Sequence, residues 1–349
     1  MSDAKRRKKA RRVRTALIVL CVILSIILTA IIGVYIYIDH MLGQLNYVTD
    51  HTTLSTEEAA SIAQGEWETI HPDDTDHVEE TVTVPTDPGS SVEQGDHIVN
   101  ILLIGQDRRP GEGTQRSDSM ILVTFNKSSG DIWLTSIMRD QYVNIPGYGQ
   151  DKLNHSYFYG GMPLLDQTLY DHFGIEVDGN VEVDFSGFEK IIDMLGGVEV
   201  EVTKKEARFI KRDYGLDIEP GLTTLNGEEA LVFSRIRYLD SDYKRSERQR
   251  MVLTSLFNKI KGSSLSTMLS LIDDILPLVT TDIPKTQIIG YAMDLFPMLS
   301  GTELQSQRIP VDGTFSEGYV KIDSKHKMWC QYNVDFEANR EVLRKIFAE

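Results

Sequence analysis

The sequence predicts a layered α/β/α domain with a central mixed sheet, preceded by one transmembrane helix. Short apolar runs typical of buried strands alternate along residues 97–349 with longer segments whose apolar residues recur at helical spacing. Near the amino terminus, residues 15–38 form an uncharged run of 24 residues, which is long enough to cross a bilayer. The mixture of strands and helices favours one layered domain over a β-sandwich.

The charge around the uncharged run predicts its orientation. Residues 1–14 hold eight Lys and Arg against Asp3 alone, a net charge of +7. Because the whole chain has a net charge of −16, the rest of it carries −23. By the positive-inside rule, this basic tail is cytoplasmic. The run is longer than the apolar region of a cleaved signal peptide and ends in Tyr35-Ile36-Tyr37-Ile38, so we expect an uncleaved anchor. Everything that follows it is then extracytoplasmic.

The next segment, 39–96, is predicted to be an acidic extracytoplasmic linker. Residues 51–96 contain no Lys or Arg, whereas acidic residues recur among Thr, Ser and Pro. A short helix is expected at 56–64, and 72–94 has the composition of an extended, self-repelling chain. The folded catalytic domain is predicted to begin at 97 and to continue to 349.

Within 97–349, each predicted element follows from a local pattern. The first strand ends at Gly105, a turn at 126–130 separates the second strand from the third, and Gly196-Gly197 ends a helix. Strands are predicted at 98–105, 119–125, 131–138, 179–185, 198–202 and 232–237. Helices are predicted at 153–173, 188–195, 227–231, 248–261, 265–278, 285–299 and 336–347.

Clustered arginines occupy the stretch 232–250 of this acidic chain. Arg235 and Arg237 are two residues apart, so on the predicted strand their side chains share one face. If the next helix begins near Arg245, then Arg245, Arg248 and Gln249 lie on one side of it. Guanidinium groups bind phosphate through paired hydrogen bonds and stay charged, which suits a buried polyanion. A solvated basic helix remains the alternative.

Polar residues also stand at the ends of neighbouring strands. Asp107 follows the first strand, Arg116 and Asp118 precede the second, and Arg139 with Asp140 follows the third. Strand ends are where layered α/β folds bind ligands, and Mg²⁺ in proteins commonly takes one or two carboxylates. The pattern therefore allows a metal site at Asp107 and Asp118, although a turn role for Asp107 and an ion pair between Asp118 and Arg116 are alternatives.

Several other functions are disfavoured. A body with a net charge of −23 is unsuited to nucleic acid, and no Gly-x-Ser-x-Gly, His-Glu-x-x-His, Cys-x-x-Cys or phosphate-loop motif is present. His155 could act as a base, but a histidine satisfied by its neighbours is the favoured interpretation.

A series of ordered motifs resembles the LytR–CpsA–Psr phosphotransferases of bacterial cell-wall assembly over roughly 98–261. The motifs are NILLIGQD at 100–107, RSDSM at 116–120, RD at 139–140, KLNH at 152–155, DFSGF at 184–188, LGGV at 195–198, LNGEEAL at 225–231, SRIR at 234–237 and RQ at 248–249. One departure is Met138, which stands where the family usually has proline. The predicted amino-terminal span is also similar to that of the family.

The resemblance implies a site and a reaction. It assigns a divalent cation, Mg²⁺ or Mn²⁺, to Asp107 and Asp118. It assigns the pyrophosphate of a polyprenyl-linked glycan to Arg116, Arg139, Arg235, Arg237, Arg245 and Gln249, with catalysis resting on Asp107, Arg116, Asp118, Arg139, Arg235 and Arg237. The implied reaction moves a teichoic acid or capsular glycan with one phosphate onto a peptidoglycan sugar hydroxyl and releases polyprenyl phosphate. The implied location is the plasma membrane of a Gram-positive-type envelope, with the catalytic domain outside.

Three questions remain open from the sequence. A non-catalytic lipid-pyrophosphate binder or sensor, or a hydrolase, would need the same site, whereas fourteen cytoplasmic residues cannot form a DNA-reading domain. The base for the acceptor hydroxyl is not evident; Asp107, Asp118 and Asp242 are candidates. Residues that could line an isoprenoid tunnel, with core packing as the default, are Leu164, Leu165, Leu169, Phe173, Ile191, Ile192 and Leu195.

Overall fold

The computed structural model describes residues 37, 39–40, 42–48, 53–71, 78–79, 82, 84, 92–107, 115–237, 239, 241–261 and 263–348. The chain separates into two units, Met1–Leu45 and Asn46–Glu349, and every element named below belongs to the second. The predicted tail at 1–14, and the predicted transmembrane segment at 15–38 except Tyr37, lie outside the described residues. No helix within the described part combines the length and the apolar composition that a membrane span requires.

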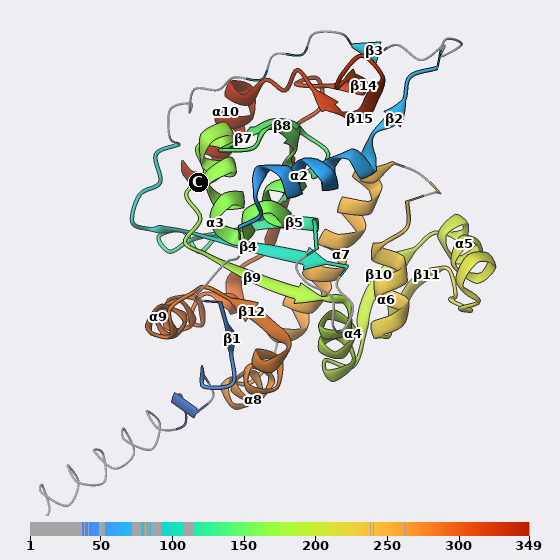
Figure 1. Cartoon of the computed structure of the whole chain (residues 1–349). Helices are drawn as coiled ribbons and strands as arrows, with labels where there is room; N and C mark the ends of the chain where they lie inside the picture. The colour runs from blue at the N-terminus through green and yellow to red at the C-terminus, as the bar shows by residue number, and fades with distance from the viewer. Residues whose placement is uncertain are drawn as a thin grey trace, which may run out of the picture. The chain divides into compact units, whose positions relative to one another are not determined.

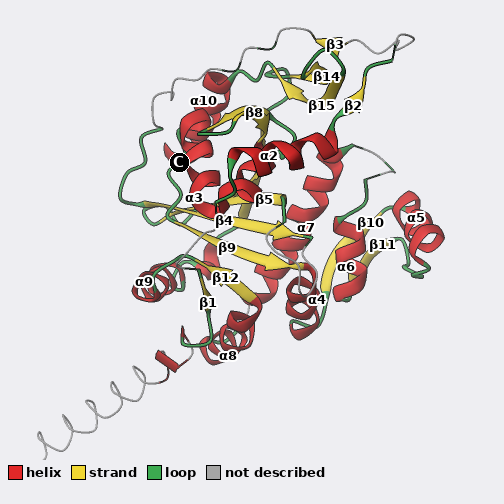
Figure 2. Cartoon of the chain, viewed as in Figure 1, coloured by secondary structure: helices red, strands yellow, loops and turns green. Residues whose placement is uncertain are grey.

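The central layer is a seven-stranded sheet in the order β1-β12-β9-β4-β5-β6-β13 (Figures 1 and 2). Its strands are β1 (Asn46–Tyr47), β4 (Ile98–Gln106), β5 (Ser117–Asn126), β6 (Ile132–Ile137), β9 (Gly179–Asp184), β12 (Val279–Thr281) and β13 (Leu304–Ile309). β4 runs parallel to β9 and antiparallel to β5, and β6 runs antiparallel to β5 and parallel to β13. The predicted mixed sheet is therefore confirmed.

Helices cover both faces of this sheet. α3 (Leu153–Phe173) and α10 (Phe336–Ala348) pack against each other and against β5. On the other face lie α4 (Phe185–Met194), α6 (Gly227–Ser234) and α7 (Asp242–Lys261), which contact one another in chain order (Figure 1). α8 (Leu265–Ile275) and α9 (Lys285–Leu295) flank the β1–β12 edge, and the short 3-10 helices η2 (Leu276–Leu278) and η3 (Leu299–Gly301) follow them.

The two-residue period of the strands assigns alternate side chains to these two layers. Leu102 of β4 and Leu122 of β5 are paired and fully buried, in a core that also contains Leu165 and Leu169 of α3. The next pair, Leu103 and Ile121, points to the opposite face, toward α4, α6 and α7. The same strands therefore build the core with one face and the wall of a pocket with the other.

The predicted strand at 232–237 is wrong. The structure continues α6 through Ser234, and Arg235 is its C-terminal cap. Asn226 and Glu229 form a capping box at the start of the helix, and the buried face includes Ala230 and Phe233, both 0% exposed. Tertiary burial of this face outweighs the β-branched and aromatic composition of the run. The following helix, α7, begins at Asp242, earlier than predicted.

Several elements escaped prediction. They include a hairpin of β7 (Tyr142–Ile145) and β8 (Gly149–Lys152), the helix α5 (Lys204–Tyr214), the sheet strands β12 and β13, and the strands β11 (Gly221–Leu225), β14 (Ser316–Lys321) and β15 (His326–Tyr332). In contrast, α3 and β10 (Val198–Val202) have the predicted bounds, although Gly160 and Gly161 interrupt α3 with non-helical backbone angles. Gly161 has a φ of 64°, a conformation that glycine adopts without steric cost.

Part of the predicted linker at 39–96 belongs to the folded unit. α2 (Thr56–Ala63) begins with a Ser55–Glu58 capping box and buries two alanine side chains, and η1 (Gln64–Glu66) continues it. β2 (Glu68–Thr69) then pairs with β15, and β3 (Val78–Glu79) pairs with β14. The folded unit therefore starts before residue 97, the start predicted from composition.

Candidate functional site

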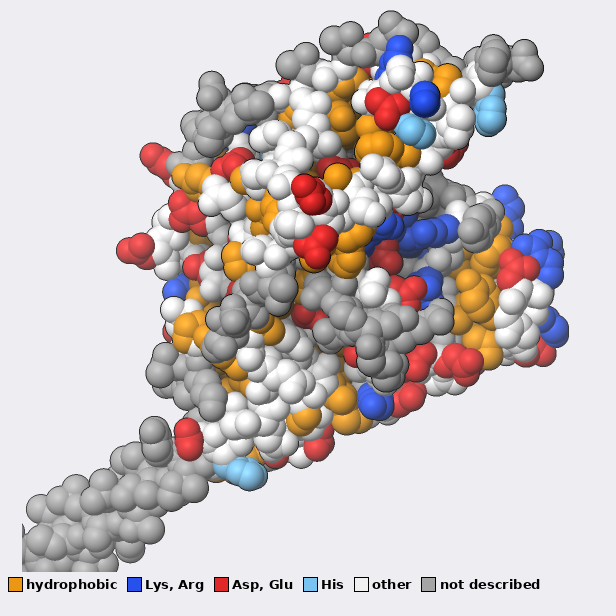
Figure 3. All heavy atoms as spheres, in the orientation of Figure 1, with side chains coloured by type: hydrophobic (Ala, Val, Ile, Leu, Met, Phe, Trp, Pro, Cys, Tyr) orange, Lys and Arg blue, Asp and Glu red, His pale blue; other side chains and the backbone are white. Residues whose placement is uncertain are grey.

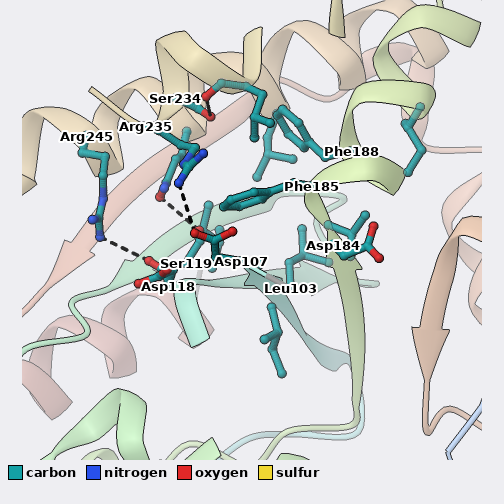
Figure 4. Close-up of a pocket in the computed structure, with 18 of the residues that line it drawn as sticks. Leu103, Asp107, Asp118, Ser119, Asp184, Phe185, Phe188, Ser234, Arg235 and Arg245 are labelled. Carbon is teal, nitrogen blue, oxygen red and sulfur yellow. Dashed lines mark hydrogen bonds and ion pairs between the residues drawn. The ribbon is translucent and has the colours of Figure 1, made fainter. Parts of the chain in front are cut away.

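A pocket of about 430 Å³ lies between the central sheet and the helices α4, α6 and α7 (Figure 4). Its sheet wall is apolar and includes Leu103, Ile121, Val181 and Val183. The helical wall adds the apolar residues Phe185, Phe188, Ile191, Leu231, Leu253 and Leu256, with Tyr214 from the end of α5. A pocket with these walls suits a long hydrocarbon group.

One end of the pocket is charged. The polar residues that line it come from the ends of β4 and β5, the segment after α6, and the first turns of α7: Asp107, Asp118, Ser119, Arg235, Arg237, Arg245 and Gln249. On the face drawn in Figure 3, Lys and Arg side chains lie together with Asp and Glu side chains in a hollow of the surface. An apolar cavity with an arginine-rich end fits a ligand that has an apolar tail and an anionic head.

The two aspartates pair with different arginines. Arg235 Nη2 lies 3.2 Å from Asp107 Oδ2, and Arg237 Nη2 lies 3.4 Å from Asp118 Oδ1. Arg139 also pairs with Asp118. The guanidinium of Arg235 additionally lies over the ring of Phe185, 4.2 Å from its centroid, which restricts the orientation of the guanidinium.

Arg245 is the most deeply buried arginine of the pocket, at 5% exposed. Its Nη2 donates to the backbone carbonyl of Asp118 at 3.2 Å, and its Nη1 lies 2.9 Å from Asp242 Oδ1 (Figure 4 draws the first contact). Burial, together with the charge of nearby Arg139, lowers the pKa of Arg245 to about 10. Its buried Nε has no hydrogen-bond partner among the described residues.

Gln249 lies one helical turn after Arg245 on α7. Its Oε1 accepts a hydrogen bond from Ser119 Oγ at 3.0 Å, which fixes the side-chain amide against β5. Arg248, which the helical spacing placed on the same side, does not join the pocket. It is 3% exposed and donates to Glu206 Oε1 at 2.6 Å and to the carbonyl of Ile236 at 3.1 Å.

This bond from Arg248 supports the segment that carries two of the pocket arginines. Ile236 is fully buried, whereas Arg235 and Arg237 on either side of it both line the pocket. The predicted common direction of these two arginines is therefore confirmed, although the predicted strand is absent.

Two of the predicted site residues lie beside the pocket and do not line it. The side chain of Arg116 pairs with Glu66. Arg139 contacts Asp118 on one side, and its Nε lies 3.4 Å from Asp140 Oδ2 on the other. Burial opposes the charged form of Arg139, but the charges of Asp140 and Asp118 outweigh it and raise the pKa of Arg139.

The residues present are compatible with a divalent cation. Asp107 and Asp118 line the same end of the pocket, and two carboxylates supplemented by water and substrate phosphate are a common Mg²⁺ environment. Within the described part of the chain, no group of three or more His, Cys, Asp or Glu residues could hold a metal by itself. Any cation at this place would therefore share the two carboxylates with arginines and take further oxygens from the ligand.

Met138 forms part of the turn that presents Arg139. It is 3% exposed, and its backbone N–H donates to the carbonyl of Ile309 at 2.9 Å. A proline at this position has no N–H and could not make this bond. Met138 therefore allows a hydrogen bond between the turn and β13 that a proline would not allow.

His155 agrees in part with its favoured interpretation, since its Nδ1 has a close partner, whereas its buried Nε2 has no hydrogen-bond partner among the described residues. It is 0% exposed, its Nδ1 lies 2.9 Å from Asp151 Oδ2, and it does not line the pocket. Of the residues suggested for an isoprenoid tunnel, Ile191 does line the pocket. Leu165, Leu169 and Phe173 instead belong to the core on the other face of the sheet.

Sequence reasoning missed two features of the site. Glu66, assigned to the linker, pairs with Arg116, and no local pattern predicts a contact over fifty positions. The apolar wall was also missed, although its signal was present. Leu103 and Ile121 are one position out of phase with the core residues Leu102 and Leu122, so strand periodicity alone separates the two faces.

Comparisons with known proteins agree with this architecture. The model of the LytR_cpsA_psr family matches residues 58–334. The chain is 38% identical over 208 residues to the polyisoprenyl-teichoic acid–peptidoglycan teichoic acid transferase TagT of Bacillus subtilis, which covers 58% of this chain and 64% of TagT. It is 31% identical over 242 residues to the corresponding transferase TagU of Enterococcus faecalis, which covers 67% of this chain and 77% of TagU.

The match to TagT thus spans slightly less than two thirds of that protein. A solved structure, the LytR-CPS2A-psr family protein YwtF (TagT) with bound octaprenyl pyrophosphate lipid, has a TM-score of 0.55 and 26% identity to this chain. That comparison covers 78% of this chain and 100% of YwtF, which comes from Bacillus subtilis.

Proposed function

We propose, because this chain belongs to the LytR_cpsA_psr family, that it is a phosphotransferase of cell-wall assembly. Its donor would be a polyprenyl-pyrophosphate-linked anionic glycan, either a teichoic acid or a capsular polysaccharide. Its acceptor would be a sugar hydroxyl of peptidoglycan, and polyprenyl phosphate would be released.

The observation that supports this proposal is that one pocket combines apolar walls with an arginine-rich end. The apolar walls around Leu103, Ile121 and Phe188 suit a prenyl chain, and four polar side chains that line the far end, Arg235, Arg237, Arg245 and Gln249, suit a pyrophosphate. The bound octaprenyl pyrophosphate of the related YwtF structure supports the same assignment.

In the proposed reaction, the acceptor hydroxyl oxygen attacks the phosphorus nearest the glycan. The bond from that phosphorus to the bridging oxygen breaks, and negative charge collects on the departing polyprenyl phosphate. Phosphoryl transfer needs positioning and charge stabilisation more than covalent chemistry. Arg235, Arg237 and Arg245 would provide both, because their guanidinium groups already lie at this end of the pocket.

Asp107 and Asp118 would hold a Mg²⁺ or Mn²⁺ ion. When bound, such a cation neutralises charge on the phosphate oxygens. The two carboxylates also orient the arginines, since Asp107 pairs with Arg235 and Asp118 with Arg237. The proton of the acceptor hydroxyl would pass to water or to a carboxylate at this end of the pocket, where Asp107, Asp118 and Asp242 are the candidates.

The proposal includes a location. A membrane anchor at 15–38 with its basic tail at 1–14 inside the cell would hold the folded unit outside, where a membrane-bound lipid-linked glycan and peptidoglycan meet. The prenyl tail of the donor is itself a membrane lipid, which explains why an anchored enzyme would be favoured.

The test uses the full-length chain in detergent or vesicles with a short-chain polyprenyl-pyrophosphate saccharide, Mg²⁺ and a peptidoglycan oligomer. We expect release of polyprenyl phosphate and attachment of the saccharide phosphate to the oligomer. Release of polyprenyl phosphate without attachment would favour a hydrolase. Binding without any release, across several acceptors, would favour a lipid-pyrophosphate sensor and contradict the transferase proposal.

A further inference from the structure

Behind the charged end of the pocket lies a series of alternating charges that begins at Glu66. This residue ends η1, in the amino-terminal segment that composition assigned to a linker. Its carboxylate pairs with Arg116, lies 2.8 Å from Lys152 Nζ, and lies 3.7 Å from His155 Nε2. One carboxylate is thus surrounded by three basic side chains.

The series continues to the pocket. Lys152 Nζ lies 3.3 Å from Asp140 Oδ1, Asp140 Oδ2 lies 3.4 Å from Arg139 Nε, and Arg139 pairs with Asp118. Glu66 is therefore connected to the pocket by two routes. The direct route is through Arg116, two positions before Asp118, and the indirect route is through Lys152, Asp140 and Arg139.

The groups of the indirect route are well shielded from water, whereas the side chains of Glu66 and Arg116 are 23% and 32% exposed. The side chains of Lys152, Asp140 and Arg139 are 11%, 13% and 15% exposed, respectively. Burial opposes the charged form of Glu66, but the neighbouring His155 and Lys152 outweigh it and lower the pKa of Glu66 below its ordinary range. Removing one partner from a buried ionic network leaves a charge uncompensated, and the remaining groups then shift.

We infer that Glu66 is a positioning residue, which fixes the guanidinium groups of Arg116 and Arg139 beside the pyrophosphate end of the pocket, within reach of the ligand's phosphates. This inference rests on the proposed function, because it assigns these two arginines to the same anionic ligand. Glu66 does not line the pocket and acts only through its neighbours. The segment between β1 and β4 therefore completes the site.

A simpler role would be that Glu66 only attaches η1 to the rest of the fold. The two roles predict different kinetics. A misplaced guanidinium stabilises the transition state less, so loss of positioning lowers kcat, whereas a purely structural contact changes the free energy of unfolding and leaves the kcat of the folded fraction intact.

The experiment compares Glu66→Gln with wild type in the full-length chain, by release of polyprenyl phosphate and by thermal unfolding. We expect kcat to fall about tenfold to a hundredfold with a smaller change in KM, as for the loss of other supporting interactions. Glu57→Gln is the matched control, because Glu57 is an exposed acidic residue of the adjoining α2, and we expect it to retain wild-type kcat. Glu66→Asp keeps the charge and should lose less than Glu66→Gln.

A double variant separates the two roles further. If Glu66 acts through Arg116, then Glu66→Gln added to Arg116→Ala should reduce kcat by much less than it does in wild type. Equal kcat for Glu66→Gln and wild type would overturn the inference, as would fully multiplicative losses in the double variant. If Glu66→Gln does not fold, Glu66→Asp with the same double variant gives the decision.

The same variants distinguish this inference from the proposed function. If wild type releases no polyprenyl phosphate with any acceptor, the transferase proposal fails, and equilibrium binding of a short-chain polyprenyl pyrophosphate then tests Glu66 alone. At least threefold weaker binding by Glu66→Gln would support positioning. Unchanged binding, or no binding even by wild type, would overturn it.

Discussion

The two faces of the central sheet use the same strands for different purposes. On the α3 face, Leu102 and Leu122 pack into a closed core. On the α4–α6–α7 face, Leu103 and Ile121 form the wall of a pocket that ends in arginines and aspartates. Because successive side chains of a strand point to opposite faces, stability and ligand binding reside in neighbouring residues. Substitutions one position apart should therefore have different consequences.

The largest expected effect is on stability, from the core face. Leu102→Ala removes a fully buried side chain, and the cavity should lower the free energy of unfolding by about 2–5 kcal/mol. Chemical denaturation measures this loss. A loss as small as that of Leu103→Ala would contradict the division between the two faces.

The next effect is on activity, from the pocket face. Arg235→Ala removes a guanidinium that pairs with Asp107 and lies over Phe185, and kcat/KM for release of polyprenyl phosphate should fall a hundredfold or more, about 3 kcal/mol. Arg212→Ala is the control, since the Arg212 side chain is 71% exposed on α5. Similar activity of the two variants would remove Arg235 from the proposed site.

A pH effect should again come from the core face. Asp166 of α3 accepts a hydrogen bond from Asn180 of β9 at 2.8 Å, which favours the charged carboxylate. Burial favours the neutral form more strongly, and it raises the pKa of Asp166 to about 7. Its folded-state pKa is above the unfolded value of about 4, so the folded protein binds the proton more tightly. The stability that this proton provides is complete below pH about 4 and is lost as the pH rises through about 7, with a slope of up to about 1.4 kcal/mol per pH unit.

Asp166→Asn should remove this contribution to the slope. Urea denaturation between pH 4.5 and 7.5 measures it, by comparison with wild type and with Asp217→Asn, whose native side chain is 75% exposed. Parallel pH dependences in all three proteins would contradict the assigned shift.

The smallest expected effect is on ligand affinity, and it tests most directly the division of roles between the two faces of the sheet. Leu103→Ala removes part of the apolar wall, and binding of a polyprenyl pyrophosphate should weaken about three- to tenfold, or roughly 1 kcal/mol. Its cost to the free energy of unfolding should be clearly below that of Leu102→Ala. Titration of the lipid into each variant measures the affinity, and unchanged affinity for Leu103→Ala would mean that the prenyl chain lies elsewhere.

Much of the fold follows from local patterns. The four longest strand runs before residue 203 and the helix at 153–173 were predicted within a few residues, because their apolar spacing is strong and glycines bound them. The segment at 232–237 was misassigned as a strand because β-branched and aromatic residues dominate it. The capping box that starts at Asn226 and the burial of Phe233 instead extend the helix.

Sequence patterns predicted the parts of the site that depend on residues close together in the chain, and not those that depend on distant contacts. Arg235 and Arg237 both line the pocket, although the strand from which their common direction was predicted is absent. Helical spacing placed Arg245 and Gln249 on one side of α7, and the resemblance to the family assigned both to the pyrophosphate. Arg248 satisfied the same helical spacing but pairs with Glu206, forty-two positions away. No spacing rule distinguishes Arg245, which lines the pocket, from Arg248, which does not, since both are arginines on the same side of one helix.

By itself, the sequence determined the strongly patterned elements, such as β4, β5 and α3, the alternation of side chains between the two faces of those strands, and that cations gather in an acidic chain. These properties depend on neighbours within about four positions. Only the tertiary structure decided that Arg116 pairs with Glu66, that Arg248 is buried away from the pocket, and that α6 ends at Ser234. Those outcomes depend on burial and on charge pairing between segments far apart in the chain, and local patterns carry no information about either.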